Sequence, residues 1–462
     1  MTDTTETIVT PDPHAIARAV LLEVADESDQ VGDFVTSYDL EDHVTDFRFA
    51  ANIRGYEGWQ WSVTLYHDEE IDSWTVNESS LIPTEDAMMP YLTEEYGNPS
   101  SLYRFANRAK RALEQARAEV AQVLGADPFE ILFTAGGSEA DNWVKELMRT
   151  QKAKGKNHFI TTAVEHHAML HSAQRLQKEG YEVTFIPVDR EGQIDPEDIR
   201  RAIRPETGLV SIMFANNEIG TIYPIKEIGA ICRQAGVLFH TDAVQAVGHV
   251  KINVKEMNID MLSLSAHKFH GPKGVGAFYC RRGIPLNNLI DGGAQERGKR
   301  AGTENVAGIV GLATALRIAD SELEQTAPRL TAMRDRLIDG ILQSVPMCRL
   351  NGSRTNRLPG NCNISFLGLE GESLLLRLDL AGIAASSGSA CASSSLDPSH
   401  VLLAIGLPHE VAHGSVRLSL SDLNTEEDVD YILEKLPQIV STLRQMSPLW
   451  EQIQKGEVSF EL

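Results

Sequence analysis

One stretch of the chain constrains its fold more than any other. The apolar run 260–264 ends in the tetrapeptide Ser265-Ala266-His267-Lys268. This run is too short for a typical helix and predicts a buried strand, which the turn-forming stretch 269–274 cannot continue. Lys268 is therefore expected just past the carboxyl end of a strand, where open α/β sheets bind ligands. A lysine held there among small and aromatic groups can lose its proton and attack a carbonyl.

Other apolar runs repeat this pattern and alternate with helical stretches. We predict strands at 130–134, 159–162, 209–215 and 237–241, and helices at 105–124, 135–148 and 225–235. This alternation indicates a largely parallel sheet covered by helices. The polar residues that follow the strands should therefore meet at one edge of the sheet. They are Gly137, Ser138, His166, Asn217, Asp242 and Gln245.

These polar residues have a recognisable combined chemistry. The strand–turn–helix stretch that holds Gly137 and Ser138 has the layout of a phosphate site, because N–H groups at a helix start bind anions. His166 could stack on a planar ring, and Asp242 could keep a pyridine nitrogen protonated. With the amine of Lys268, the set is what pyridoxal phosphate requires. The sequence therefore predicts a pyridoxal-phosphate site, and it predicts no metal site.

Charge and cysteine content exclude several classes of protein. The net charge of −23 argues against nucleic acid or an anionic membrane as a main partner. No apolar run approaches the ~20 residues of a membrane span, and the acidic start lacks the basic region of a secretory signal. The five cysteines are scattered without a CxxC pair. This favours reduced thiols in the cytoplasm over a disulfide framework or structural zinc.

Residues 1–86 differ in composition from the rest and are predicted to be a separate segment of unknown function. They hold 20 acidic and three basic side chains, no lysine, and three tryptophans. We predict a helix at 14–25 and a strand at 59–66, and the tryptophans argue against simple disorder. An interaction module is one interpretation, but we favour a solvated appendage. The segment loosely resembles the start of an uncharacterised bacterial protein family.

The rest of the chain is predicted to form a large domain at 87–320 and a smaller one at 321–462. In the smaller domain we expect helices at 329–345, 372–380 and 421–446 and a strand at 362–366. The run 385–398 consists of small residues with almost no apolar anchor, and it contains Cys391. Cys391 is therefore predicted to be an accessible, mobile thiol and a candidate nucleophile. Burial is expected for the others, Cys232, Cys280, Cys348 and Cys362.

Residues 87–435 resemble the cysteine desulfurases, pyridoxal-phosphate enzymes with the aminotransferase class V fold. The matching stretches are 136–139 (Gly-Gly-Ser-Glu), 165–166 (Glu-His), 216–220 (Asn-Asn-Glu-Ile-Gly), 242–245 (Asp-Ala-Val-Gln), 265–268, 387–391 (Ser-Gly-Ser-Ala-Cys) and 416–420 (Val-Arg-Leu-Ser-Leu). The resemblance implies an α/β transferase of fold type I. Its large domain would have a mostly parallel sheet, and its smaller α+β C-terminal domain would carry a mobile cysteine loop.

The resemblance also implies a role for each site residue. Lys268 would form the Schiff base with the cofactor, Asp242 would pair with the pyridine nitrogen, and His166 would stack on the ring. Arg417 would bind the substrate carboxylate, which suits an arginine fork. The remaining contacts to the cofactor would come from Asn217 and Gln245 at the ring oxygen, and from Gly137, Ser138, Ser265 and His267 at the phosphate. In a homodimer, Thr303 of the Gly-rich loop 292–305 would reach the phosphate of the partner subunit.

The implied reaction converts L-cysteine to L-alanine. Lys268 would move protons on the substrate, and the Cys391 thiolate would attack the substrate sulfur to give an enzyme persulfide. A mobile loop suits the transfer of that sulfur to an iron–sulfur scaffold or another acceptor protein. Two alternatives stay open. One is a selenocysteine lyase or another class V enzyme, and the other is a catalytically impaired fusion that acts as a binding scaffold.

One stretch departs from the family pattern. Family members begin with a strand such as Tyr-Leu-Asp-Asn-Ala-Ala-Thr-Thr beside the substrate site, whereas this chain has Trp-Thr-Val-Asn-Glu-Ser-Ser-Leu at 74–81. The acidic segment therefore replaces that strand. It either supplies a substitute wall for the site or leaves the site incomplete.

Overall fold

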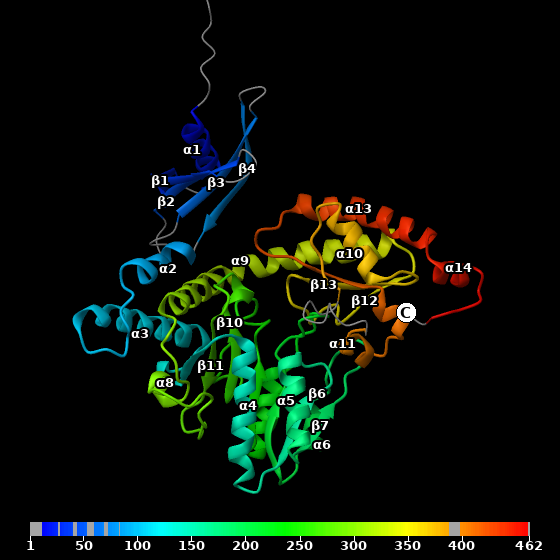
Figure 1. Cartoon of the computed structure of the whole chain (residues 1–462). Helices are drawn as coiled ribbons and strands as arrows, with labels where there is room; N and C mark the ends of the chain where they lie inside the picture. Colours follow the sequence, from blue (N-terminus) through cyan, green and yellow to red (C-terminus); the bar gives the residue numbers. More distant parts are fainter. Residues whose placement is uncertain are drawn as a thin grey trace, which may run out of the picture. The chain divides into compact units, whose positions relative to one another are not determined.

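The computed structural model describes residues 12–25, 28–39, 44–52, 60–68, 73–82, 84–387 and 398–460. The chain divides into two compact units, Met1–Ala116 with Asn305–Ala315, and Arg117–Glu304 with Leu316–Leu462. Two long helices, α3 (Arg104–Leu124) and α9 (Val306–Ser344), contribute residues to both units (Figure 1). Among the described residues, no helix combines the length and the apolar character needed to cross a membrane.

A seven-stranded sheet forms the centre of the second unit. Its strands, in spatial order, are β5 (Ile131–Thr134), β11 (Gly276–Cys280), β10 (Met261–Ser265), β9 (Leu238–Asp242), β8 (Thr207–Ser211), β6 (His158–Thr162) and β7 (Glu182–Ile186). Only β11 is antiparallel to its neighbours, β10 and β5. The prediction of a largely parallel sheet is therefore confirmed.

Helices cover this sheet, and their packing explains why its strands are apolar on both faces. All residues of β6, β8, β10 and β11 are buried. Helix α4 (Gly137–Lys152) lies beside α5 (His167–Lys178) against the sheet (Figure 1). Trp143 of α4 stacks on Phe278 of β11, with the ring centroids 5.2 Å apart. The other elements of this region are η2 (Pro128–Glu130), α6 (Pro196–Ala202), α7 (Ile225–Ala235), η3 (Ala266–Phe269) and α8 (Gln295–Gly298).

The same unit contains a second, three-stranded antiparallel sheet. It consists of β12 (Cys348–Leu350), β13 (Asn361–Phe366) and β14 (Ser415–Ser419). Leu337 and Ile341 of α9, together with Leu436 from the amphipathic helix α13 (Glu426–Gln445), belong to one buried apolar cluster with β13 and β14. The remaining helices are α10 (Gly371–Asp379), α11 (His400–Ala404), α12 (His409–His413) and α14 (Pro448–Gln454).

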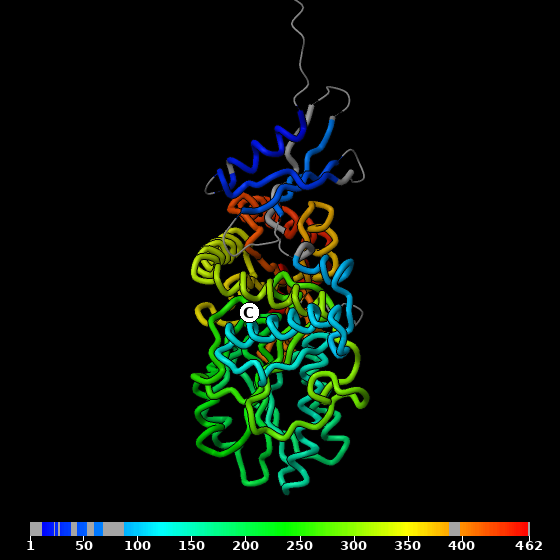
Figure 2. Tube along the Cα trace, turned by 90° about the vertical axis from the view of Figure 1, so that its left-hand side faces the viewer, coloured from blue at the N-terminus to red at the C-terminus, as the bar shows by residue number. Residues whose placement is uncertain are grey.

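The first unit contains a four-stranded antiparallel sheet in the order β1-β2-β3-β4. Its elements are α1 (Pro13–Val24), η1 (Ser28–Gln30), β1 (Val31–Asp39), β2 (Val44–Ala51), β3 (Gln60–Asp68), β4 (Ser73–Ile82) and α2 (Thr84–Thr93). Figure 2 shows α1, in dark blue, alongside these strands. Leu21 of α1 is buried, as are Phe47, Phe49 and Val63 on alternate positions of paired strands. The predicted helix at 14–25 and strand at 59–66 are thus present within a folded core.

Several expectations need correction. The acidic segment is not merely a solvated appendage, because three further strands complete a sheet with a buried face. The stretch 74–81 lies in β4 and pairs with β3, so it belongs to this sheet and not to the seven-stranded one. Strand β8 ends at Ser211 and not at 215, although Phe214 N still donates to Asp242 O at 2.7 Å. The predicted helix 329–345 is the second half of α9.

Candidate active site

A cavity of about 640 Å³ lies at the carboxyl end of the seven-stranded sheet. Its walls come from the ends of β5, β6, β8, β9 and β10 and the segments that follow them, with one side chain from β14. Because parallel strands end at the same edge, segments far apart in sequence meet here. The predicted residues that line it are Gly137, Ser138, His166, Asn217, Asp242, Gln245, Ser265, His267, Lys268 and Arg417.

The cavity includes the N-terminus of α4. The helix begins after Gly136, which has a φ of 150° and supplies no side-chain cap. A Cβ on Gly137 would stand 2.5 Å from Val244 Cγ2, so any larger residue there would have to displace Val244 at the cavity wall. The N–H groups of a first helical turn have no carbonyl partner within the helix, and they suit an anion. Ser138 adds a hydroxyl, and Ser265 Oγ lies 2.9 Å from His267 Nδ1 at the same wall.

A histidine and a carboxyl group lie close together in the wall of the cavity. His166 begins α5 and accepts the N–H of Ala168 at Nδ1 (3.2 Å), which fixes its ring. Asp242 is the last residue of β9, and its Oδ1 accepts from Val244 N at 3.0 Å. Burial lowers the pKa of His166, and burial raises the pKa of Asp242 although His166 opposes that rise. A cationic ring nitrogen placed at Asp242 would reverse the rise.

Lys268 stands on the short helix η3, directly after β10. Its side chain lines the cavity, and its backbone O accepts from His249 Nε2 at 2.8 Å. His270, which follows this turn, has a φ of 62°, so the chain reverses direction immediately after the lysine. The sequence prediction that Lys268 lies just past a strand end is confirmed.

The loop 216–220 holds Asn217 at the cavity and is fixed by side chains of the three-stranded sheet. Arg417 of β14 donates from Nη1 to Asn217 O at 2.6 Å. Asn361 and Asn363 of β13 both donate to Glu218 O, at 3.1 and 3.0 Å. These bonds place the guanidinium of Arg417 beside the loop, where an arginine fork can meet a carboxylate.

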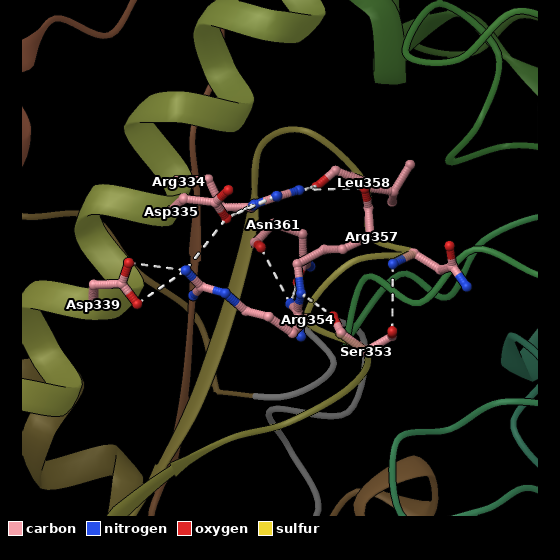
Figure 3. Close-up of polar contacts among 9 residues, drawn as sticks. Arg334, Asp335, Asp339, Ser353, Arg354, Arg357, Leu358 and Asn361 are labelled. Atoms are coloured by element: carbon pink, nitrogen blue, oxygen red, sulfur yellow. Dashed lines mark hydrogen bonds and ion pairs between the residues drawn. The ribbon is translucent and has the colours of Figure 1, made fainter.

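Buried arginines hold the turn 351–361, which leads into β13, against α9 (Figure 3). Arg357 donates from Nη1 to Asn361 Oδ1 (2.7 Å) and to Asn361 O (3.2 Å). Arg334 of α9 donates to Leu358 O at 3.1 Å. Since Asn361 also binds Glu218 O, the arginines support the loop that carries Asn217.

Thr303 does not line the cavity and is exposed. Its Gly-rich loop is anchored at two points. Arg300 Nε donates to Glu139 Oε1 at 2.9 Å, and Glu296 forms a buried pair with Arg117 at 2.8 Å. The exposed position agrees with the expectation that Thr303 serves a partner subunit, which remains a prediction.

Cys391 lies outside the described residues, but both flanks of its segment are described. Ser386 and Arg417 exchange two backbone hydrogen bonds (3.1 and 2.6 Å). On the other flank, Ser399 Oγ donates to Glu218 Oε2, and His400 Nε2 lies 2.9 Å from Glu165 O. Both flanks are therefore fixed beside cavity-lining residues.

The other cysteines behave largely as predicted. Cys232, Cys280 and Cys362 are buried, and burial raises the pKa of each thiol to about 12. Cys348 at the start of β12 is only partly buried, which corrects the expectation for that residue. Its strand is at the edge of the three-stranded sheet, so one side of it is left uncovered.

Sequence reasoning missed two buried carboxyl groups at this site. Asp141 lines the cavity and Glu165 immediately precedes His166. Burial raises the pKa of Glu165 to about 8, although Thr162 Oγ1 (2.8 Å) and Met213 N (3.0 Å) both donate to it. A signal for Asp141 existed, because its spacing of three from Ser138 places both on one face of a helix.

Comparison with known proteins agrees with this architecture. The sequence matches the family described as Aminotransferase class-V over residues 80–432. Residues 32–93 match a family described as a protein of unknown function (DUF3027). The chain belongs to the class V aminotransferase family.

Individual relatives show which group of class V enzymes the chain resembles. The chain is 59% identical over 375 residues to the cysteine desulfurase IscS of Clostridium botulinum (strain Hall), covering 80% of this chain and 94% of that protein. Its identity to the cysteine desulfurase IscS of Methanosarcina thermophila is 56% over 365 residues, covering 79% and 90%. Within its class, the chain belongs to the cysteine desulfurases.

Solved structures show the same fold. A NifS-like protein superimposes with a TM-score of 0.73 at 39% identity, covering 77% of this chain and 95% of that chain. SspA in complex with cysteine superimposes with a TM-score of 0.64 at 36% identity, covering 72% and 93%. The expected fold of a class V, type I transferase is confirmed.

Proposed function

We propose that this chain holds pyridoxal 5′-phosphate at Lys268 and converts L-cysteine to L-alanine, with the sulfur passed to Cys391. One observation carries the proposal. A single cavity brings together Lys268, the buried carboxyl of Asp242, the ring of His166 and the N-terminus of α4. No pair of these groups adjoins in sequence, so the fold assembles them.

The described residues fit the cofactor. The uncapped start of α4, with Ser138 and the Ser265–His267 pair, suits a phosphate. Asp242 is a buried acid that a pyridine nitrogen would keep ionised, and His166 presents a flat ring on the same cavity. Asn217 and Gln245 supply amides for the ring oxygen. When bound, the cofactor supplies an electron sink for the α-carbon of the substrate.

Side chains of the protein would bind the substrate, transfer protons and accept the sulfur. Arg417 binds the substrate carboxylate through its guanidinium. Lys268 Nζ removes a proton from the substrate α-carbon and returns one to the carbon skeleton. The Cys391 thiolate attacks the substrate sulfur, so an S–S bond forms as the carbon–sulfur bond breaks. The products are alanine and a persulfide on Cys391.

The flanks of the cysteine segment support this role. Ser386 is paired with Arg417, and Ser399 is bound to Glu218, next to Asn217. Both anchors of the segment that contains Cys391 are thus bound to residues of the site or to their direct neighbours. We further propose that the persulfide sulfur goes to an iron–sulfur scaffold or another sulfur-acceptor protein in the cytoplasm, and that the active form is a homodimer in which Thr303 reaches the phosphate site of the partner subunit.

The first experiment replaces Cys391 in the full-length holoenzyme. Cys391→Ala should keep the yellow absorbance of the bound cofactor, because the cavity is unchanged, and it should lose persulfide formation and nearly all sulfide release. Both are measured after addition of L-cysteine, with alanine quantified in parallel. Cys348→Ala is the matched control, since Cys348 is the one described cysteine that is only partly buried, and it should retain full activity.

Lys268→Ala completes the test. It should lose the cofactor absorbance band and all alanine production. Full desulfurase activity in Cys391→Ala would refute the role of that thiol, and an unchanged spectrum in Lys268→Ala would refute the cofactor assignment. A wild-type protein that binds no cofactor and makes no alanine would favour the scaffold alternative, and faster release of selenide than of sulfide would favour a selenocysteine lyase.

A further inference from the structure

Asp141 has no place in the roles described so far, although it lies at the centre of the site. It stands on α4, is 1% exposed, and lines the cavity. Its Oδ1 atom is buried without a hydrogen-bond partner among the described residues. An orphaned carboxyl oxygen costs free energy unless it shares a proton with a neighbour.

Among the described residues, no basic side chain is one of the main groups that shift the pKa of Asp141. His240 Nε2 lies 4.0 Å from Asp141 Oδ1. Both nitrogens of His240 are already hydrogen-bonded to hydroxyl groups, Nδ1 to Ser211 Oγ at 2.8 Å and Nε2 to Ser263 Oγ at 3.0 Å. Burial lowers the pKa of His240 to about 3, so the ring is neutral at physiological pH. Glu165, also nearby, adds a further acidic group.

Asp242 is the important neighbour. One side-chain atom from each of Asp141, His166 and Asp242 lies within 4.8 Å of the other two, and the two carboxyl groups are close enough to hydrogen-bond. Two buried carboxyl groups in contact hold one proton between them, because both cannot be ionised. The pair therefore contains one neutral acid and one carboxylate.

The surroundings decide which partner is neutral. Asp242 receives the N–H of Val244 at 3.0 Å, and both His166 and Lys268 favour its charge. Burial and the neighbouring charge of Asp242 raise the pKa of Asp141 well above its usual range, although a hydrogen bond from Ser263 opposes that rise. The proton therefore belongs on Asp141.

We propose that Asp141 is a neutral carboxylic acid that donates a hydrogen bond to Asp242 and keeps Asp242 as a single, oriented negative charge facing the ring nitrogen of the cofactor. Asp141 is thus a positioning residue, and it acts through Asp242. This inference rests on the proposed function, because it concerns the carboxylate assigned to the cofactor.

The test compares Asp141→Asn with Asp141→Ala by titrating each apoprotein with pyridoxal phosphate and following absorbance. An asparagine amide can donate the same bond, so Asp141→Asn should bind the cofactor within about threefold of wild type. Asp141→Ala removes a bond to a charged group and should weaken binding by tenfold or more. Glu146→Gln, on the same helix but paired with Arg149 at the surface, is the matched control and should bind normally.

A second measurement needs no cofactor. The folded pKa of Asp141 is raised, so its contribution to apoprotein stability is fully present below its unfolded pKa of about 4 and is lost as pH rises toward the folded value. Asp141→Asn cannot titrate, so its stability relative to wild type should rise with pH across that range. The other titrating groups that face Asp141, namely Asp242, Glu165, His166 and His240, are present in both proteins.

The outcomes are distinct. If Asp141→Asn weakens cofactor binding as much as Asp141→Ala while both apoproteins melt at the wild-type temperature, Asp141 does not act as a donor and the inference is overturned. A stability difference that is independent of pH would show that Asp141 is ionised, which also overturns it. If wild type binds no cofactor, the proposed function fails, while the pH experiment still decides the protonation of Asp141.

Discussion

Two residues of the Gly-rich loop have a backbone conformation that side chains other than glycine rarely adopt. Glu296 has a φ of 46° and Arg297 a φ of 59°, at a cost of about 1–3 kcal/mol each. The Glu296 carboxylate offsets this cost, because both its oxygens bind Arg117 (2.8 and 2.9 Å) and it accepts from Phe133 N at 3.0 Å. The glycines alone would indicate a mobile loop, yet this buried pair fixes it.

At this scale, Glu296→Gln should destabilise the protein strongly. The substitution leaves the buried Arg117 guanidinium without its counter-charge, and breaking such a pair costs about 3–5 kcal/mol. Urea unfolding of the apoprotein measures the change in the free energy of unfolding. Glu197→Gln removes an exposed pair with Arg200 and should cost less than about 1 kcal/mol. Equal losses in the two variants would contradict the anchoring role of Glu296.

At the scale of elements, the sequence predicted the strands that carry the site better than those that do not. Strands β6, β9 and β10 are short, almost entirely buried segments that are followed by polar residues, so the sequence predicted both their positions and those polar groups. The antiparallel β11 was not predicted, because pairing direction depends on partners distant in sequence. Helix α9 was predicted only in part, since Pro328 interrupts the helical pattern without ending the helix.

Asp141 and the arginine-supported turn show why part of the site could not be predicted. A carboxyl group inside an amphipathic helix usually faces water, so its spacing of three from Ser138 was a weak signal, and the packing of α4 on the sheet shows that Asp141 faces the cavity. The bonds from Arg357 to the turn likewise depend on tertiary structure. The acidic segment was underestimated for a similar reason, because its charge indicated solvation while its sheet was recognisable in only one of four strands.

At the element scale, Arg357→Ala should loosen the turn 351–361. Ser353 O and Asn361 Oδ1 would lose the hydrogen bonds that Arg357 donates to them (2.8 and 2.7 Å). Because these buried acceptors would stay unsatisfied, the free energy of unfolding should fall by about 2–4 kcal/mol. Urea unfolding measures the loss. Arg336→Ala is the control, because Arg336 of α9 makes exposed ion pairs with Glu426 and Asp430 and should cost under about 1 kcal/mol. A loss for Arg357→Ala as small as for the control would argue against a structural turn.

At the scale of the whole molecule, two compact units share one chain. The first unit has its own buried sheet face, with Phe47 and Val63 paired across β2 and β3. The second holds every described residue that lines the cavity. The match to 32–93 lies within the first unit, whereas the match to 80–432 covers most of the second unit and the α2–α3 part of the first.

Val63→Asp should therefore unfold the first sheet and leave the cofactor site intact. Val63 is fully buried, and a carboxylate there has no partner. Loss of β-structure, followed by circular dichroism, should accompany an unchanged cofactor absorbance and a wild-type turnover number. Tyr66→Asp, at an exposed position of the same strand, should change neither property. Loss of turnover in Val63→Asp alone would show that the first sheet supplies the wall that the family strand provides elsewhere.

The backbone pairing of Ser386 with Arg417 would limit how far the proposed sulfur carrier, Cys391, can reach. An extended chain advances at most ~3.5 Å per residue, so the five peptide units from Ser386 to Cys391 reach about 18 Å. If Cys391 carries the persulfide, as proposed, an acceptor thiol or cluster has to come within that distance of Ser386. The length of the segment would then limit which acceptor proteins can receive the sulfur.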